Sequence, residues 1–259
     1  MYILIGDIGN TVAKLCLIDV KTYKLNKILY LDSKKIISQN FLKKELSKIF
    51  KKKNIMNIAL FSCVVPLYEK ELKKVLKKYY HINLKEIKNK GINKIVKLAI
   101  KDKNQVGSDR VANAVGVFKK YKTNSIVLDF GTATTFDVVT SDGFYKGGII
   151  APGINNSIKS LSTSADQIPI FSLKKPRIII GKNTLEALSS GFYWGYSGLI
   201  NNLIHKIEME TKKKHKIILT GGYAALFKTS INRLCVIDKN ITIDGVIEIY
   251  KANEEYLKK

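Results

Sequence analysis

The chain has 259 residues, 46% of them hydrophobic, which is enough for one large domain or two of ordinary size around a buried core. The formal net charge of +24 would suit a nucleic-acid partner, but only three of the 45 basic residues are arginines and the lysines spread over many segments. We therefore expect that the lysines lie on solvated surfaces and that the protein does not bind nucleic acid. Because no apolar run approaches the length of a signal sequence or a membrane span, we also expect a cytoplasmic protein without a membrane partner.

The first part of the chain alternates β-prone and amphipathic segments. Two short strands around a Gly-Asn-Thr turn are predicted first, and a helix, a buried strand and a second helix follow them. A short β segment then precedes a third helix. In chain order these elements cover 2–8, 12–18, 40–53, 57–66, 67–80, 95–100 and 107–121.

The pattern restarts after residue 121. Three strands are followed by a long helix, and Asn183 and Glu186 form a predicted capping box at its start. A strand that enters a Gly-Gly turn comes next, and a short strand and a closing helix end the chain. The three cysteines lie singly in apolar segments, which favours reduced, buried thiols over disulfides or a zinc site. These predicted elements cover 125–130, 135–140, 144–150, the segment after Asn183, 216–220 and 241–258.

An Asp-x-Gly sequence follows the first strand of both halves, with Asp7 in one and Asp129 in the other. One such hairpin is also what an ordinary glycine turn with an Asx cap would produce. The repetition predicts an internal duplication with domains 1–121 and 122–259 and a cleft between them, where α/β sheets place ligands.

The composition of the two turns suits phosphate binding. Backbone N–H groups in a tight glycine turn can hold phosphate oxygens, Thr and Asn side chains add donors, and a neighbouring Asp can hold a hydrated cation. A Thr-Gly-Gly sequence after a late strand adds a third element of this kind. Because neither a P-loop nor a Gly-x-Gly-x-x-Gly sequence is present, the pattern predicts a nucleotide held by turns of another type.

Seven segments in this order resemble those of the type III pantothenate kinases, of the acetate-and-sugar-kinase, heat-shock-chaperone and actin superfamily. The resemblance implies an α/β fold of two ribonuclease H-like domains with an active-site cleft between them, in a homodimer. It also implies transfer of the γ-phosphoryl group of ATP to the primary hydroxyl of pantothenate, giving 4'-phosphopantothenate, the first step of coenzyme A synthesis. The segments are GDIGNT (6–11), SCVVP (62–66), GSDRVANAVG (107–116), DFGTATTFDVV (129–139), GGIIAPGI (147–154), IGKNTLEALSSGFYWGYSGLI (180–200) and TGGYAALF (220–227).

For the acceptor substrate, the resemblance implies that Asp109 is the catalytic base, that Arg110 fixes the pantothenate carboxylate, and that Gly107 and Ser108 are further substrate-binding residues. Thr184 would reach pantothenate and the cation across the dimer interface. From the residues alone, Asp109 could equally be a carboxylate favoured by a helix N-terminus, Arg110 a surface ion pair, and Thr184 a second helix cap.

For ATP, the resemblance makes Asp7 the carboxylate that organises Mg²⁺ or another divalent cation and Asp129 the position of a monovalent cation, K⁺ or NH₄⁺. From the residues alone, both carboxylates could instead be turn caps. The residues implied to bind ATP are Asp7, Gly9, Asn10, Thr11, Gly131, Thr132, Thr134, Gly148, Gly221 and Gly222.

The chain departs from the resembling family just before Gly107, where Tyr-x-Asn-Pro is replaced by Ile100, Asp102 and Lys103 in the corresponding places. An aromatic side chain from elsewhere, or a changed substrate affinity, is therefore expected. A related kinase with another hydroxyl substrate and a non-catalytic regulatory homologue remain the alternatives. In the segment 184–207, a broad apolar face and three glycines allow a second helix to approach, which suits a homodimer or an internal domain interface, and the resemblance favours the homodimer.

Overall fold

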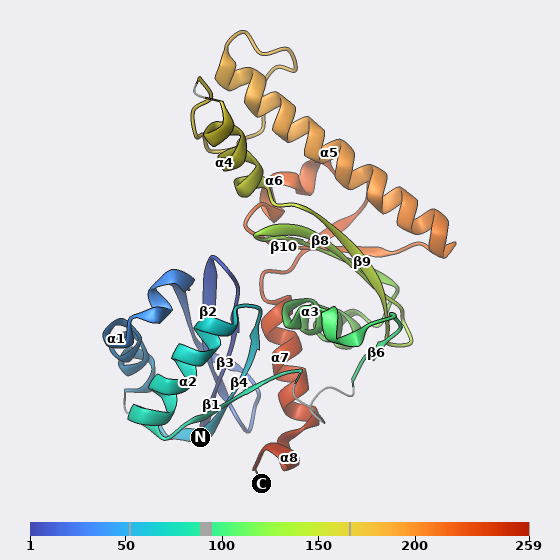
Figure 1. The fold of residues 1–259 in the computed structure, drawn as a ribbon. Helices are drawn as coiled ribbons and strands as arrows, with labels where there is room; N and C mark the ends of the chain where they lie inside the picture. Colours follow the sequence, from blue (N-terminus) through green and yellow to red (C-terminus); the bar gives the residue numbers. More distant parts are fainter. Residues whose placement is uncertain (52, 89–94, 166, 259) are drawn as a thin grey trace. The chain divides into compact units, whose positions relative to one another are not determined.

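The computed structural model describes residues 1–259 except 52, 89–94, 166 and 259, and its ribbon is shown in Figure 1. The chain forms two compact units. Unit 1 consists of Met1–Tyr121, Gly143–Tyr145 and Asn240–Lys259, and unit 2 consists of Lys122–Asp142 and Lys146–Lys239. The first break follows residue 121, where the predicted domains 1–121 and 122–259 also divide, and the closing segment 240–259, which we predicted in the second of them, belongs to unit 1.

The sheet of unit 1 has the strand order β3-β2-β1-β4-β5. β1 (Tyr2–Ile8) pairs antiparallel with β2 (Val12–Asp19), which pairs antiparallel with β3 (Leu25–Asp32). β4 (Ile55–Cys63) is parallel to β1, and β5 (Asn83–Glu86) is parallel to β4. The carboxyl ends of β1, β4 and β5 therefore meet at one edge of the sheet.

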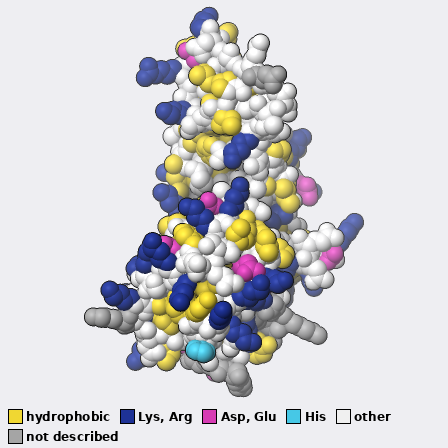
Figure 2. Space-filling model, turned by 60° about the vertical axis from the view of Figure 1, so that its left-hand side comes forward, with side chains coloured by type: hydrophobic (Ala, Val, Ile, Leu, Met, Phe, Trp, Pro, Cys, Tyr) yellow, Lys and Arg dark blue, Asp and Glu magenta, His cyan; other side chains and the backbone are white. Residues whose placement is uncertain are grey.

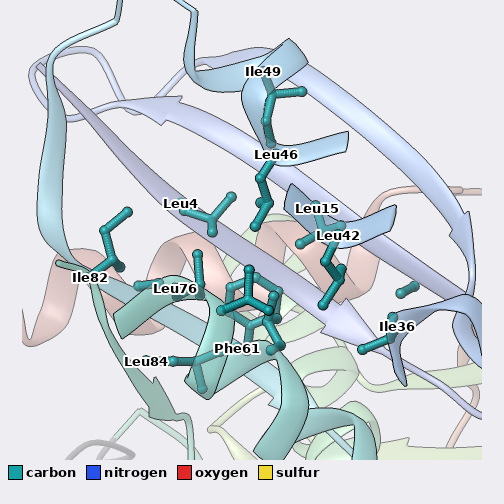
Figure 3. Packing of buried hydrophobic residues seen from close by; sticks show 14 of the residues in the cluster. Leu4, Leu15, Ile36, Leu42, Leu46, Ile49, Phe61, Leu76, Ile82 and Leu84 are labelled. Carbon is teal, nitrogen blue, oxygen red and sulfur yellow. The ribbon is translucent and has the colours of Figure 1, made fainter. Parts of the chain in front are cut away.

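Helices cover both faces of this sheet. Leu4, Leu15 and Phe61 pack against helices η1 (Ser33–Ile37), α1 (Gln39–Phe50) and α2 (Pro66–Tyr80) in one core cluster, drawn in Figure 3. α3 (Ser108–Tyr121) and α7 (Ile241–Ala252) pack closely together and contact β4 and β1, and Thr242 donates a buried hydrogen bond to Asn113 across them (2.8 Å). β1 is buried on both faces, which explains its nearly continuous apolar sequence.

The second sheet repeats this topology, with the order β11-β10-β7-β8-β9 and β6 added beside β9. β7 (Ser125–Phe130) pairs antiparallel with β8 (Ala133–Val139) and parallel with β10 (Lys216–Gly221), and β10 pairs parallel with β11 (Cys235–Ile237). β9 (Phe144–Pro152) begins in unit 1, where its first two residues pair with β6 (Lys97–Leu98). The strand orders confirm the α/β fold of duplicated, ribonuclease H-like topology.

The core of unit 2 lies between this sheet and its helices, α4 (Ile154–Ser164), α5 (Thr184–Thr211) and α6 (Ala224–Phe227). Stacked rings of Phe130, Phe227 and Tyr193 join β7, α6 and α5. The Asn183 side chain caps α5 as expected by accepting from the Glu186 N–H (2.9 Å), but the Glu186 carboxylate accepts from the N–H of Lys182 (2.7 Å), one residue before the cap.

Most expected elements are confirmed within a few residues, and the differences have local causes. The expected helix 40–53 ends at Phe50, and residue 52 lies outside the described residues. The expectation of a strand within 241–258 is wrong, since α7 and α8 (Glu254–Lys258) occupy that segment and the short strand β11 lies before it. None of the helices in the described part of the chain is long and apolar enough to cross a membrane.

Candidate active site

The β1–β2 turn of unit 1 carries the first predicted phosphate-binding residues. Asp7 stands at the carboxyl end of β1, opposite Lys14 of β2 and Ser62 of β4. The N–H of Gly9 donates to the carbonyl of Val12 (3.1 Å), which closes a tight turn. Asn10 and Thr11 are exposed at its tip, where the predicted contacts to phosphate oxygens would need them.

The β7–β8 turn of unit 2 repeats this arrangement. Asp129 lies near the carboxyl end of β7, opposite Thr220 of β10, and the N–H of Gly131 donates to the carbonyl of Ala133 (3.0 Å). Thr132 is exposed at the tip, and its carbonyl accepts from the Asn156 side chain of α4 (3.0 Å). Thr134, by contrast, is fully buried, so the two threonines expected at the phosphates have different surroundings.

The Gly-Gly turn after β10 lies beside this second hairpin. Gly221 has φ +83°, and a Cβ there would stand 2.6 Å from the backbone of Phe130, so both the backbone conformation and the close approach require glycine. The N–H of Gly222 donates to the carbonyl of Phe130 (3.0 Å). The structure thus brings the predicted residues 129–132 and 221–222 together, and Gly148 is exposed on β9.

The start of α3 carries the predicted acceptor residues, and Ser108 fixes it to β4. The Ser108 Oγ accepts from the N–H of Cys63 (2.8 Å) and donates to the carbonyl of Cys63 (2.9 Å), and the residue is 2% exposed. The Ser108 hydroxyl is therefore hydrogen-bonded to the backbone of β4, and this structural tie holds the start of α3 against the strand.

Asp109 follows in the first turn of α3. Its Oδ1 accepts from the N–H of Arg110 (2.8 Å), and a Cβ on Gly107 would lie only 2.4 Å from the same oxygen, so glycine leaves room for the carboxylate. Burial raises the pKa of Asp109 above its ordinary value, although the Arg110 N–H, the Arg110 guanidinium and the Lys88 ammonium act in the opposite direction. A carboxylate with a raised pKa is a stronger base than an exposed aspartate.

Arg110 lies over an aromatic ring, a contact that the sequence did not predict. Its guanidinium carbon is 5.9 Å from the ring centroid of Tyr145, which is 1% exposed in β9. The N–H of Ala99 donates to the carbonyl of Tyr145 (2.9 Å), so this tyrosine also adjoins the segment where Ile100 stands. The sequence left open an aromatic from elsewhere or a changed substrate affinity, and the pairing of the two-residue strand β6 with β9 brings Tyr145 next to the segment of Ile100.

Each unit has a concave region beside its predicted residues. In unit 1, a cavity of about 370 Å³ adjoins the start of α3 and includes Cys63, Glu69, Glu86, Lys88 and Gly107 in its lining. Burial raises the pKa of the Cys63 thiol to about 12, so this cysteine stays protonated and is a poor nucleophile. In unit 2, a hollow of about 830 Å³ lies between Thr132 and α4.

The remaining predicted positions concern the cations and the partner subunit. Within the described residues, no three His, Cys, Asp or Glu side chains are grouped as metal ligands. Asp7 and Asp129 each offer one carboxylate at a strand end, which suits Mg²⁺, since it commonly binds one or two carboxylates together with phosphate and water oxygens. Thr184 is exposed at the first position of α5, where Asn183 provides the cap.

Comparison with known proteins agrees with the motifs. A family model described as type III pantothenate kinase matches residues 3–206. A type III pantothenate kinase of Pelagibacter ubique (strain HTCC1062) is 44% identical over 245 residues, 95% of this chain and 97% of that protein. Another, of Syntrophus aciditrophicus (strain SB), is 36% identical over 257 residues, 97% of this chain and 99% of that protein. A conserved putative Baf family transcriptional activator from Campylobacter jejuni has a similar fold, with a TM-score of 0.61 at 21% identity over 97% of this chain and 99% of that one.

Proposed function

The chain belongs to the type III pantothenate kinase family, and on that premise we propose which of its residues carry out the reaction. The family function is ATP-dependent phosphorylation of pantothenate in coenzyme A biosynthesis. The observation that carries the residue assignment is the start of α3, where a largely buried carboxylate with a raised pKa lies next to an arginine and a cavity.

Asp109 is the general base. As the primary hydroxyl oxygen of pantothenate bonds to the γ-phosphorus of ATP, the bond to the β,γ-bridging oxygen breaks, ADP leaves, and the hydroxyl proton passes to the Asp109 carboxylate. Because the transfer depends mainly on positioning, the tie of Ser108 to Cys63 and the space left by Gly107 matter as much as basicity.

Arg110 binds the carboxylate of pantothenate, since a planar guanidinium can donate two parallel hydrogen bonds to a carboxylate. The Tyr145 ring beside it limits the orientations that the guanidinium can take. In this assignment Tyr145 is the aromatic neighbour of the acceptor site, in a chain that has Ile100 where the family has a tyrosine.

Each of the two hairpin turns offers donors for phosphate oxygens of ATP. Their exposed tips, Asn10 and Thr11 in one and Thr132 in the other, offer donors, and Gly221 and Gly222 allow close approach of the backbone beside the second tip. Asp7 would hold a divalent cation and Asp129 a monovalent one, and such cations supply positive charge that offsets the charge of the phosphates. The buried Thr134 would support the turn from beneath.

The proposed assembly is a homodimer in the cytoplasm. Gly191, Gly195 and Gly198 are exposed on α5, and a Cβ at any of them would have no described neighbour within 4 Å. Trp194 and Leu185 on the same helix are 41% and 49% exposed. Glycine inside a helix costs about 1 kcal/mol relative to alanine, so a flat, partly apolar helix face with three glycines is best explained by a second copy packed on it.

A coupled assay of ADP release, with and without pantothenate, tests the function. We expect ADP release that depends on pantothenate, with 4'-phosphopantothenate as the product by mass spectrometry. Turnover with another hydroxy compound and none with pantothenate would indicate a related small-molecule kinase, and the absence of any turnover would indicate a non-catalytic homologue. Binding of duplex DNA is not expected, since Figure 2 shows the lysines and arginines scattered over the visible face between other side chains.

A further inference from the structure

Lys88 joins the end of β5 to the segment that precedes Gly107. Its Nζ donates to the carbonyl oxygens of Asn104 (2.8 Å) and Val106 (2.6 Å). Both are charge-assisted hydrogen bonds, which are stronger than those between neutral groups. One side chain thus fixes two carbonyls just upstream of the residues that start α3.

The joined segment has few other constraints of its own. Residues 99–106 contain no proline and only the single turn η2 (Lys103–Gln105), where Asp102 accepts from the N–H of Asn104 (2.9 Å). Residues 101–105 are exposed. The hydrogen bond from Ala99 to Tyr145 holds one end of the segment, and the Lys88 ammonium holds the other. Loss of Lys88 would therefore remove both side-chain contacts to the carbonyls next to Gly107 and leave the buried Val106 side chain and the Ser108 tie as the remaining constraints at this end.

Lys88 also acts on Asp109 through its charge. Its ammonium lowers the pKa of Asp109 and so partly offsets the effect of burial. Among the described residues, the other charged groups around the two are Arg110 on α3, Glu86 on β5 and Glu69 on α2. Glu86 is 8% exposed and burial raises its pKa, whereas Arg110 and Lys88 are cations that lower the pKa of Asp109.

We propose that Lys88 is a positioning residue for phosphoryl transfer: by binding the Asn104 and Val106 carbonyls it holds Gly107 and Asp109 in the geometry that the reaction needs. This inference rests on the proposed function of Asp109 as the base. It also assigns a role to a lysine that none of the motifs of the chain includes.

The test compares Lys88→Met with Lys88→Arg, which keeps the charge and can donate to two carbonyls. Lys101→Met, which removes an exposed lysine from the same segment, is the matched control. For Lys88→Met we expect kcat to fall by ~10- to 10²-fold, with KM for ATP unchanged, because small displacements of a catalytic group have costs of this order. The acid limb of the pH–rate profile should move to higher pH, since Asp109 loses a cation that lowers its pKa.

Two further measurements separate positioning from general damage. Amide hydrogen exchange in 99–107 should accelerate in Lys88→Met and not in Lys101→Met. Lys88→Arg should recover most of the lost kcat and the original acid limb. If Lys88→Met does not fold, Lys88→Gln removes the charge with a polar side chain and is held to the same expectations.

The outcomes distinguish this inference from the proposed function. If Asp109→Asn is inactive while folded Lys88→Met, or Lys88→Gln in its place, has the kcat, pH profile and exchange of the Lys101→Met control, the inference about Lys88 is wrong and the role of Asp109 stands. If Asp109→Asn keeps normal turnover, the base assignment itself fails, and with it the basis for Lys88.

Discussion

Replacing Ser108 by alanine distinguishes a structural tie from a substrate contact. The change removes an acceptor for the Cys63 N–H and a donor to the Cys63 carbonyl; the Ser108 side that these groups face is 2% exposed, whereas Cys63 itself is half-buried. A hydrogen bond contributes about 1 kcal/mol, and a buried partner left without one costs about 1–3 kcal/mol. We therefore expect Ser108→Ala to lower the free energy of unfolding by about 2–4 kcal/mol.

Urea unfolding followed by circular dichroism measures this loss. Ser164→Ala is the matched control, because the Ser164 hydroxyl donates to a carbonyl of its own helix on the surface (2.8 Å), and its removal should change the free energy of unfolding by less than about 0.5 kcal/mol. In steady-state kinetics, Ser108→Ala should lose kcat, because the first turn of α3 carries Asp109.

A different pattern would refute the reasoning. If the unfolding midpoint and slope of Ser108→Ala match those of the unsubstituted chain while only KM for pantothenate rises, the hydroxyl of Ser108 contacts the substrate and does not hold α3. That result would return Ser108 to the substrate-binding role that the sequence suggested.

Three other predictions concern the reaction and the assembly. Asp109→Asn should still bind ATP in calorimetry but lose roughly 10²–10⁴ in kcat, the span of a positioned acid–base group, and near-normal turnover of this variant would exclude the base role. In the unsubstituted enzyme, kcat/KM should fall as the pH drops through the raised pKa of Asp109, because the base becomes protonated. Turnover should need a divalent cation and should be higher in potassium or ammonium than in sodium, so equal rates in sodium and potassium buffers would count against a monovalent site at Asp129. Asp109→Asn and Thr184→Ala should each inactivate the enzyme alone, and mixing subunits of the two variants should restore activity in the heterodimers. If heterodimers form without activity, Thr184 acts in the site of its own subunit or in no site.

The sequence predicted best the elements whose hydrophobic pattern is strong. β1 and β7 begin and end where expected, and α2 begins one residue earlier than expected. β3 and β5 were not predicted, because β3 is largely exposed and β5 has four residues, two of which are charged. Their pairing with β2 and β4 comes from the sheet rather than from local preference, and a short or exposed strand has little apolar periodicity to detect.

The candidate site was predictable where a motif holds its residues together in the sequence. Asp7, Asp129 and Asp109 all lie at strand or helix ends, as their glycine neighbours indicate. Lys88 and Tyr145 could not be found in this way, because each reaches the site through a contact between distant segments. The signal for Tyr145 was the short β-prone segment near 95–100, but nothing in it specifies β9 as the partner strand.

Motif membership also groups residues that the fold separates. Thr132 and Thr134 belong to the same Gly-Thr-Ala-Thr sequence, yet β8 begins at Ala133, so only Thr134 follows the alternation of the strand. In that alternation Thr134 faces the same way as Phe136 and Val138, which belong to the core of unit 2. The expected strand began at 135, two residues late, and this shift left Thr134 in the turn. The assignment of Thr134 to the phosphates came from the resemblance and stays a prediction, and the strand boundary adds that its side chain lies on the buried side of β8.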